Sequence, residues 1–313
     1  MLTQNAWTLK AGWFTMARGF LLKVPNVLKF IHLTDVHLIS GGRRLYGVSP
    51  ERRLHAAVDS ILEDHSDADF VVFTGDQAHW GDDASYGVLS DAIARLDMPV
   101  KVLMGNHDHR DVLLRVVPGV ESDAHGFVQS ALDTQAGRCL FLDTKKDAPT
   151  DAGEYCETRR GWLRDRLAES DEPVMIFMHH PPLKLGLKGM DIIDLLDSGA
   201  FFDVLKPHVG KIRHIFFGHV HRPISGNWRG IGFTCIRGLN HQLALDLRAP
   251  QTSVPGNFEP PVYGVVLADR DQIVAHLHEF MDRSPQFELV TPDGQDGKEY
   301  SLNMRHGDWD HMT

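Results

Sequence analysis

Gly105-Asn106-His107-Asp108 follows the apolar run Val100-Lys101-Val102-Leu103-Met104, and this stretch decides the fold class. The apolar run has the length and composition of a buried strand. An amide oxygen, an imidazole and a carboxylate stand at its end, and all three are metal-ligand groups. Because Gly-Asn is also an ordinary turn, the stretch predicts a metal site only if other strands end in the same way.

Four other apolar runs also end in carboxylate or imidazole side chains. These runs cover 27–33, 69–74, 173–178 and 212–217. The residues that follow them are Asp35 and His37, Asp76, His179 and His180, and His219 and His221. One such residue at a strand end is usually a hydrogen-bonded turn residue, whereas chance rarely places coordinating residues at five strand ends. The spacing in Asp35-x-His37 and His219-x-His221 directs both side chains to one side if strand geometry continues.

Helices are predicted between these strands. Ser49-Pro50-Glu51 is a helix start, with a serine cap and proline at the first helical position. Further helices are predicted over 83–96, 158–168 and 191–205. Alternating strands and helices indicate a parallel sheet, which binds ligands at the carboxyl ends of its strands.

The remaining segments predict additional strands and a cap. Strands are expected over 126–129 and 138–142, and the Asp143 that follows is expected to be structural. After His221, short alternating runs over 223–247 and 262–280 predict antiparallel strands, which could complete a second sheet or a cap. We therefore expect an N-terminal extension (1–26), a main domain (27–284) whose segment 223–247 could include cap hairpins, and a C-terminal tail (285–313).

Composition excludes several classes of protein. The 313 residues carry a formal charge of -10, and an acidic chain is a poor candidate for binding a nucleic acid polymer. Three widely spaced cysteines argue against a disulfide scaffold or a cysteine zinc site. Neither a secretory signal nor a stretch long enough to span a bilayer is recognised, so we expect a cytoplasmic protein without membrane contact.

The candidate ligands are all oxygen or nitrogen donors. They are Asp35, His37, Asp76, Asn106, His179, His219 and His221. Carboxylate, amide and imidazole groups without thiolates suit Mn, Fe or Zn better than Ca or Mg. The set is too large for one ion, and two ions roughly 3.5–4 Å apart, bridged by a carboxylate, would use all of it.

Together these motifs resemble the calcineurin-like metallophosphoesterase superfamily, across residues 28–222. The chain is similar to bacterial class III cyclic-nucleotide phosphodiesterases and, more closely, to glycerophosphodiesterases of enterobacterial type. The closer likeness rests on Arg44-Leu45-Tyr46-Gly47, on the stretch 176–183 and on His241-Gln242. It implies an α/β fold, a four-layer αββα sandwich of two mixed sheets flanked by helices, with a small hairpin cap.

The resemblance also implies how the ligands divide. One ion would take Asp35, His37, Asp76 and His221. The other would take Asp76, Asn106, His179 and His219, so that Asp76 bridges the two ions. A water shared by the ions would lose its proton near neutral pH, and the hydroxide would attack phosphorus in line.

Roles for the remaining site residues are more open. His107 is expected to face the leaving oxygen, and Asp108 to orient an imidazole. His241, Tyr46 and His180 are candidate substrate contacts, with His180 also supporting the ligands. The basic loop at Arg43 and Arg44 could bind phosphate or be surface charge alone.

The substrate is expected to be a small phosphodiester such as a glycerophosphodiester. The main alternative is a 3',5'-cyclic nucleotide; a nuclease, a protein phosphatase, a nucleotide pyrophosphatase and a non-catalytic metal-binding scaffold also stay open. The cap could pair two subunits of a homo-oligomer.

Overall fold

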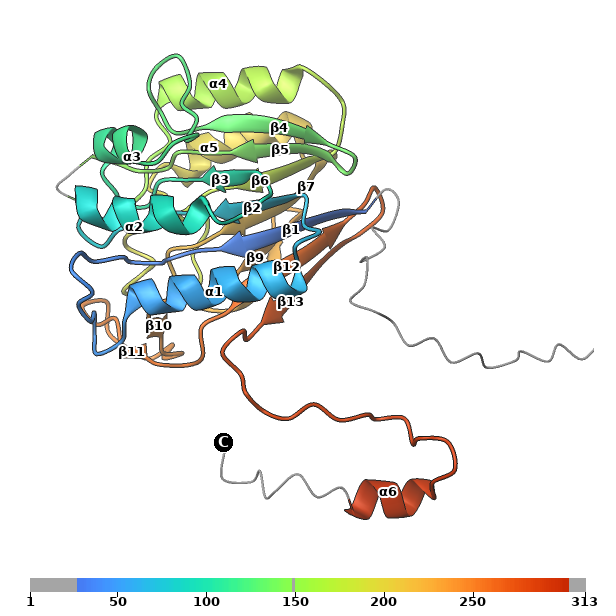
Figure 1. Cartoon of the computed structure of the whole chain (residues 1–313). Coiled ribbons are helices and arrows are strands. Elements are labelled where there is room, and N and C mark those ends of the chain that lie inside the picture. The colour runs from blue at the N-terminus through green and yellow to red at the C-terminus, as the bar shows by residue number, and fades with distance from the viewer. Residues whose placement is uncertain (1–26, 148–149, 304–313) are drawn as a thin grey trace, which may run out of the picture.

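Two mixed β-sheets lie face to face between two layers of helices (Figure 1). The computed structural model describes residues 27–147 and 150–303. The first sheet has the order β13-β12-β1-β2-β3, with β1 (Leu28–Leu33), β2 (Phe70–Phe73), β3 (Val100–Val102), β12 (Tyr263–Ala268) and β13 (Ile273–His278). The second has the order β4-β5-β6-β7-β9-β8, with β4 (Ser130–Thr134), β5 (Gly137–Phe141), β6 (Val174–Phe177), β7 (Ile212–Phe217), β8 (Ile224–Trp228) and β9 (Ile231–Cys235).

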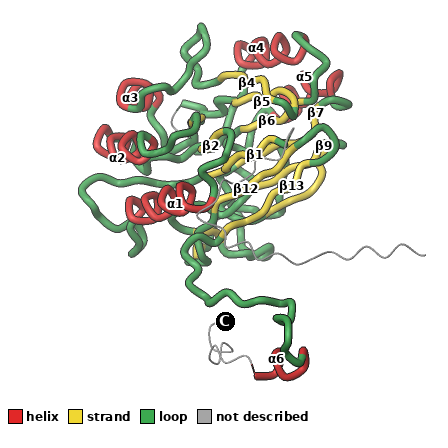
Figure 2. The backbone as a smooth tube through the Cα atoms, turned by 45° about the vertical axis from the view of Figure 1, so that its right-hand side comes forward, coloured by secondary structure: helices red, strands yellow, loops and turns green. Residues whose placement is uncertain are grey.

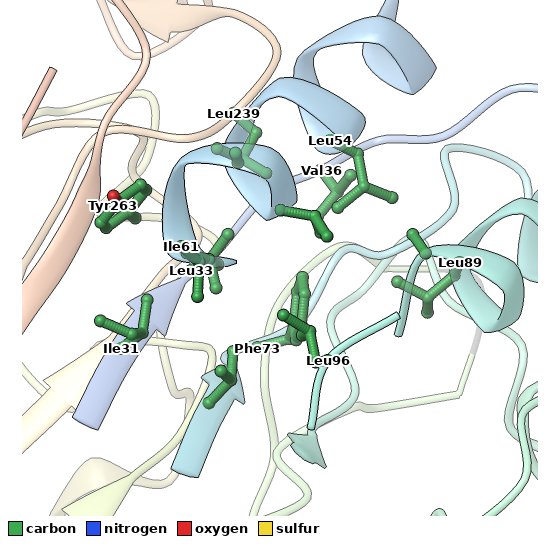
Figure 3. Packing of buried hydrophobic residues seen from close by; sticks show 14 of the residues in the cluster. Ile31, Leu33, Val36, Leu54, Ile61, Phe73, Leu89, Leu96, Leu239 and Tyr263 are labelled. Atoms are coloured by element: carbon green, nitrogen blue, oxygen red, sulfur yellow. The ribbon is translucent and has the colours of Figure 1, made fainter. Parts of the chain in front are cut away.

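Helices cover the outer faces of both sheets. The helices are α1 (Pro50–Asp64), α2 (Asp83–Ile93), α3 (Arg110–Val116), α4 (Glu157–Ala168), α5 (Ser198–Leu205), the 3-10 turn η1 (Lys206–His208) and α6 (Gly297–Asn303). As expected from the sequence, the Ser49 side chain caps α1 by accepting a hydrogen bond from the backbone N–H of Arg52. The apolar stripe of α1 then packs on β1 and β2 through Leu54, Ile61, Leu33 and Phe73 (Figure 3).

Aromatic side chains fill the space between the two sheets. Phe30 of β1 stacks on Phe70 of β2 with ring centroids 4.9 Å apart, and Phe177 of β6 stacks on Phe216 of β7 at 5.1 Å. Phe30 also meets Phe177 edge to face at 5.4 Å, which joins the two sheets. A separate apolar cluster on the far side of the second sheet buries α4 and α5. These clusters make four layers, so the expected αββα sandwich is confirmed.

Parallel pairing places the ligand-bearing strand ends together. β1 pairs with β2, β2 with β3, and β6 with β7, all in parallel. Strand β12 adds to β1 in the antiparallel direction. A small antiparallel pair of β10 (Gln242–Leu243) and β11 (Gly256–Asn257) follows β9 in the chain; β10 falls within the predicted run 223–247, whereas β11 falls between the two predicted runs.

Two predicted elements are wrong, and two of the described helices were not predicted. Residues 126–129 are not a strand, because the Asp123 carboxylate accepts hydrogen bonds from the backbone N–H groups of His125 and Phe127 and closes a turn. The helix predicted from residue 191 begins only at Ser198, because the Asp191 carboxylate binds backbone N–H groups at 185 and 186 instead. The two helices without a prediction are the short α3, which follows the Gly105–Asp108 motif, and α6, which lies in the predicted C-terminal tail.

The described residues leave out both ends of the chain. The predicted N-terminal extension, residues 1–26, lies outside the described residues. Helix α6 lies away from both sheets in the two whole-chain views (Figures 1 and 2). Within the described ranges, none of the helices has the length and apolarity required to cross a bilayer.

Candidate metal centre

The seven predicted ligands converge at the carboxyl ends of the strands. In the first group, Asp35, His37, Asp76 and His221 each offer an atom within 4.8 Å of the others. His221 Nε2 lies 3.2 Å from Asp35 Oδ1 and 3.1 Å from His37 Nε2. His37 Nε2 lies 3.6 Å from Asp76 Oδ2. These atoms surround one space, into which all four side chains point.

The second group shares Asp76 with the first. His179 Nε2 lies 3.5 Å from Asp76 Oδ2 and 3.2 Å from Asn106 Oδ1. His219 Nδ1 lies 3.0 Å from the same Asn106 oxygen. Asp76 therefore faces both groups, which is the arrangement that a bridging carboxylate requires. The seven residues could hold two cations in the division expected from the sequence.

Left-handed backbone conformations aim these side chains. Asp35, His37, Asp76, His219 and His221 have φ between 46° and 70°, a region that non-glycine residues occupy rarely. Continued strand geometry, assumed in the sequence reading, is therefore not what brings each pair together. The left-handed backbone at these positions turns each side chain toward the site instead. Each such residue costs on the order of 1–3 kcal/mol, and strain of this kind is typical of functional sites.

Two glycines allow the ligand loops to approach each other. A Cβ atom on Gly105 would lie 2.1 Å from Asp76 Oδ1, and one on Gly218 would lie 2.0 Å from Thr34 Oγ1. No side chain fits at either distance. Gly105 therefore serves close approach rather than an unusual turn, since its φ is not positive.

Backbone carbonyls orient three of the four ligand histidines. Thr74 O lies 2.7 Å from His179 Nδ1, Ile193 O lies 3.0 Å from His219 Nε2, and His241 O lies 2.7 Å from His221 Nδ1. A carbonyl oxygen can only accept, so each of these ring nitrogens carries the proton. When the ring is neutral, its opposite nitrogen holds a lone pair that faces the site and can bind a cation.

Electrostatics also favour cation binding. Burial holds the pKa of His37 well below its usual value and lowers the pKa of His219 to about 3, so both rings are neutral at pH 7. Burial would lower the pKa of His179 too, but the Asp76 carboxylate raises it to about 9. In the metal-free protein a proton on His179 thus balances the buried Asp76 charge, and a cation bound there would replace that proton.

His107 lies beside both groups, within the pocket wall. Its backbone N–H donates to Asp76 Oδ1 at 2.9 Å, and its Nδ1–H donates to the carbonyl of His79 at 2.9 Å. The ring lies 4.8 Å from that of His37, between centroids. Nε2 is then the nitrogen through which His107 can reach a bound substrate.

Asp108 has a different set of partners from the one expected. Its carboxylate accepts hydrogen bonds from the backbone N–H groups of Gln77, Ala78 and Gly105, and from the hydroxyl of Tyr86. The expected interaction with an imidazole is thus replaced by contacts that tie the loop after β2 to the loop after β3. Asp108 positions Asp76 and Asn106 rather than a histidine ring.

The weaker site predictions have mixed outcomes. His241 and Tyr46 line the pocket, with their rings 4.7 Å apart. His180 is completely buried, and its two ring nitrogens lie at hydrogen-bond distance from Thr144 and Asp151. It packs against the rings of His179 and His219, so it supports ligands, and the expected substrate contact is wrong. Asp143 is structural as predicted, because it binds the Arg110 side chain and the Val128 N–H away from the ligands.

An open pocket of about 170 Å³ gives access to the ligands. It is many times larger than the roughly 10–15 Å³ that a cavity needs to hold one water molecule. Its wall comes from loops that follow strands of both sheets and from the segment 241–254: His37, Tyr46, Asp76, His79, Asn106, His107, Asp151, Met190, Ile193, His219, His221, His241, Leu243 and Val254. Arg43 and Arg44 instead bind carbonyls of their own loop, at Ser40 and Gly47.

Two polar residues of the site were missed in the sequence. His79 stands three residues after Asp76, so its closeness in the chain to a predicted ligand could have indicated that it belongs to the site. Lys145 donates from Nζ to the carbonyl of Asn106 at 2.7 Å. No local pattern links Lys145 to a residue 39 positions away, so only the fold could reveal that contact.

Residues 28–223 match the calcineurin-like phosphoesterase family, and this span contains all seven candidate ligands. The chain belongs to that family. This membership makes it a phosphoesterase, and it agrees with the superfamily resemblance read from the strand ends. The family is metal-dependent, in accord with the two groups of buried aspartates and histidines.

Named relatives of this phosphoesterase fall into two groups. It is 44% identical over 265 residues to a probable cyclic nucleotide phosphodiesterase of Rhodopseudomonas palustris, covering 84% of this chain and 96% of the relative. It is 28% identical over 221 residues to a probable glycerophosphodiester phosphodiesterase of Arcobacter nitrofigilis, covering 70% and 81%. A dimetal phosphatase from Danio rerio shares the fold at 18% identity, with a TM-score of 0.57 and coverage of 79% and 98%.

Proposed function

We propose that this phosphoesterase hydrolyses small phosphodiesters at a centre of two transition-metal ions. The observation that carries the proposal is the pair of ligand groups that share Asp76 at the floor of an open pocket. Asp35, His37, Asp76 and His221 would hold one ion, and Asp76, Asn106, His179 and His219 the other. Their oxygen and nitrogen donors suit Mn, Fe or Zn.

When bound, the two ions would supply an activated water and neutralise the charge that grows on the phosphoryl oxygens. The protein's own groups would perform the remaining work. Backbone carbonyls hold the ligand rings, the Asp108 carboxylate ties the two central loops together, and the pocket admits a phosphate group. Because Nδ1–H is committed to the His79 carbonyl, His107 would donate to the leaving oxygen from Nε2 as a doubly protonated imidazolium, and the ring would be left neutral with its proton on Nδ1.

The variant His107→Ala tests this assignment. It is expected to bind both ions but to lose about 10²–10⁴-fold in turnover on alkyl phosphodiesters. The loss is expected to be smallest on nitrophenyl esters, since nitrophenolate departs without a proton. Turnover would be measured across esters of graded leaving-group pKa, alongside the bound metal content. An equal loss on every ester would contradict the proton-donating role, and no Mn-stimulated hydrolysis by the wild type would contradict the enzyme proposal.

Between the two substrate classes, we favour 3',5'-cyclic nucleotides over glycerophosphodiesters. The relative with 44% identity over most of both chains bears that name. In addition, Tyr46 and Trp80 expose 60% and 59% of their surface beside the ligand loops, and exposed rings can stack on a nucleobase. Turnover of cyclic AMP and glycerophosphoethanolamine would be compared on the same Mn-loaded preparation. A higher kcat/KM for the glycerol ester would reverse the preference.

The setting of this activity is also a proposal. The acidic charge of -10 and the lack of a basic stripe in the sequence support a small-molecule substrate rather than a nucleic acid polymer. We propose a cytoplasmic location and, through the cap region, a homo-oligomer. Light scattering of the purified chain would test the oligomer.

A further inference from the structure

His37 differs from the other three ligand histidines in how its ring is held. The outer nitrogens of His179, His219 and His221 all donate to backbone carbonyls. The outer nitrogen of His37, Nδ1, instead lies 3.1 Å from the Nδ1 atom of the His79 side chain. One ligand of the first ion therefore depends on a side chain that a single substitution can remove.

The geometry determines which ring donates. His37 Nε2 faces the site, 3.1 Å from His221 Nε2 and 3.6 Å from Asp76 Oδ2, so a metal-ligating His37 needs its lone pair on Nε2 and its proton on Nδ1. That proton can only go to His79 Nδ1, which must then accept with its own lone pair. The neutral His79 ring carries its proton on Nε2.

We propose that His79 is a positioning residue that sets the tautomer and orientation of His37, and thereby the affinity of the first metal site. The inference rests on the proposed division of ligands. Outer hydrogen-bond partners of this kind usually change metal affinity 10–100-fold when they are removed. The second site has no such dependence, since its two histidines are held by the carbonyls of Thr74 and Ile193.

His79 also joins the metal site to the residue expected to protonate the leaving group. Its carbonyl accepts the proton of His107 Nδ1 at 2.9 Å, and its ring stacks on that of His107 with centroids 4.7 Å apart and an 18° angle between planes. The ring of His79 thus orients the ligand His37, while its backbone carbonyl orients His107. Substitution of the side chain leaves the carbonyl in place, so the two roles can be separated.

A pair of matched variants tests the role of the ring. In His79→Asn the amide oxygen Oδ1 sits as many bonds from the backbone as histidine Nδ1, and it can accept the His37 proton. In His79→Gln the amide group extends to the place of Nε2 instead. His79→Ala removes the acceptor altogether. Each metal-free protein would be titrated with Mn²⁺, and the free ion followed by electron paramagnetic resonance.

His79→Ala and His79→Gln are expected to weaken one of the two Mn²⁺ sites about 10–100-fold and to leave the other unchanged. His79→Asn is expected to recover most of the lost affinity. Two wild-type-like sites in His79→Ala, or equal recovery by the glutamine and asparagine variants, would overturn the role of His79. Fewer than two sites in the wild type would overturn the metal assignment itself.

Discussion

Adding one methyl group at Gly105 is expected to disable the metal centre while leaving the fold largely intact. The Cβ of Gly105→Ala would lie 2.1 Å from Asp76 Oδ1 and 2.3 Å from the Asp76 backbone nitrogen. Ordinary van der Waals contact begins at 3.4 Å, so the two loops must separate by more than about 1 Å. Asp76 has little freedom to move aside, because its carboxylate accepts from His107 N–H and its carbonyl accepts from His37 N–H.

A displacement of this size exceeds what a metal site tolerates. Ligand distances in such sites hold within about 0.2 Å, so a bridging Asp76 cannot keep both ions after the shift. Removing a hydrogen-bond partner of a metal ligand, without moving the ligand itself, already lowers metal affinity about 10–100-fold. We therefore expect Mn²⁺ affinity to fall at least about 100-fold, whereas the free energy of unfolding falls by about 1–3 kcal/mol from overpacking.

The assay combines Mn²⁺ titration with urea unfolding in the presence of a chelator, which separates metal binding from stability. Gly87→Ala is the matched control, because a Cβ at that position of α2 meets nothing within 4 Å. That variant is expected to keep wild-type Mn²⁺ binding and to gain up to roughly 1 kcal/mol, since alanine favours a helix over glycine. Wild-type metal affinity in Gly105→Ala would refute the reasoning.

Two other predictions concern stability. Mn²⁺ at about 100 times its dissociation constant should raise the free energy of unfolding by about 2.7 kcal/mol per site. Urea titrations with and without a chelator would measure this increase. Identical unfolding midpoints would contradict two metal sites in the native protein. In the wild type both carboxylate oxygens of Asp108 accept hydrogen bonds from backbone N–H groups. Asp108→Asn replaces one oxygen by an NH₂ group that faces such an N–H, so the free energy of unfolding should fall by about 1–3 kcal/mol. Its turnover should fall by a similar factor on nitrophenyl and alkyl esters, because it acts on loop position; a selective loss on alkyl esters would contradict that role.

Strand ends and helix starts could be predicted from sequence because they depend on local chemistry. Apolar runs such as 69–74 can only be buried, and the Ser49 cap satisfies a backbone N–H three residues on. Prediction failed where a side chain competes with regular backbone hydrogen bonding, as Asp123 and Asp191 do. A periodicity pattern does not show whether such a carboxylate will bind its own backbone.

From the sequence alone, seven candidate ligands could be predicted, because metal-ligand side chains at five strand ends have one joint explanation; the shared role of Asp76 followed only from the family resemblance. Only the tertiary structure decided how those ligands are aimed and supported. The backbone at Asp35 and His221 adopts left-handed conformations that direct their side chains. Carbonyl groups hold the rings of three histidines, and the His79 ring holds the fourth, through contacts between segments far apart in the chain. Such contacts leave no local pattern, since they exist only after the sheets have brought the loops together.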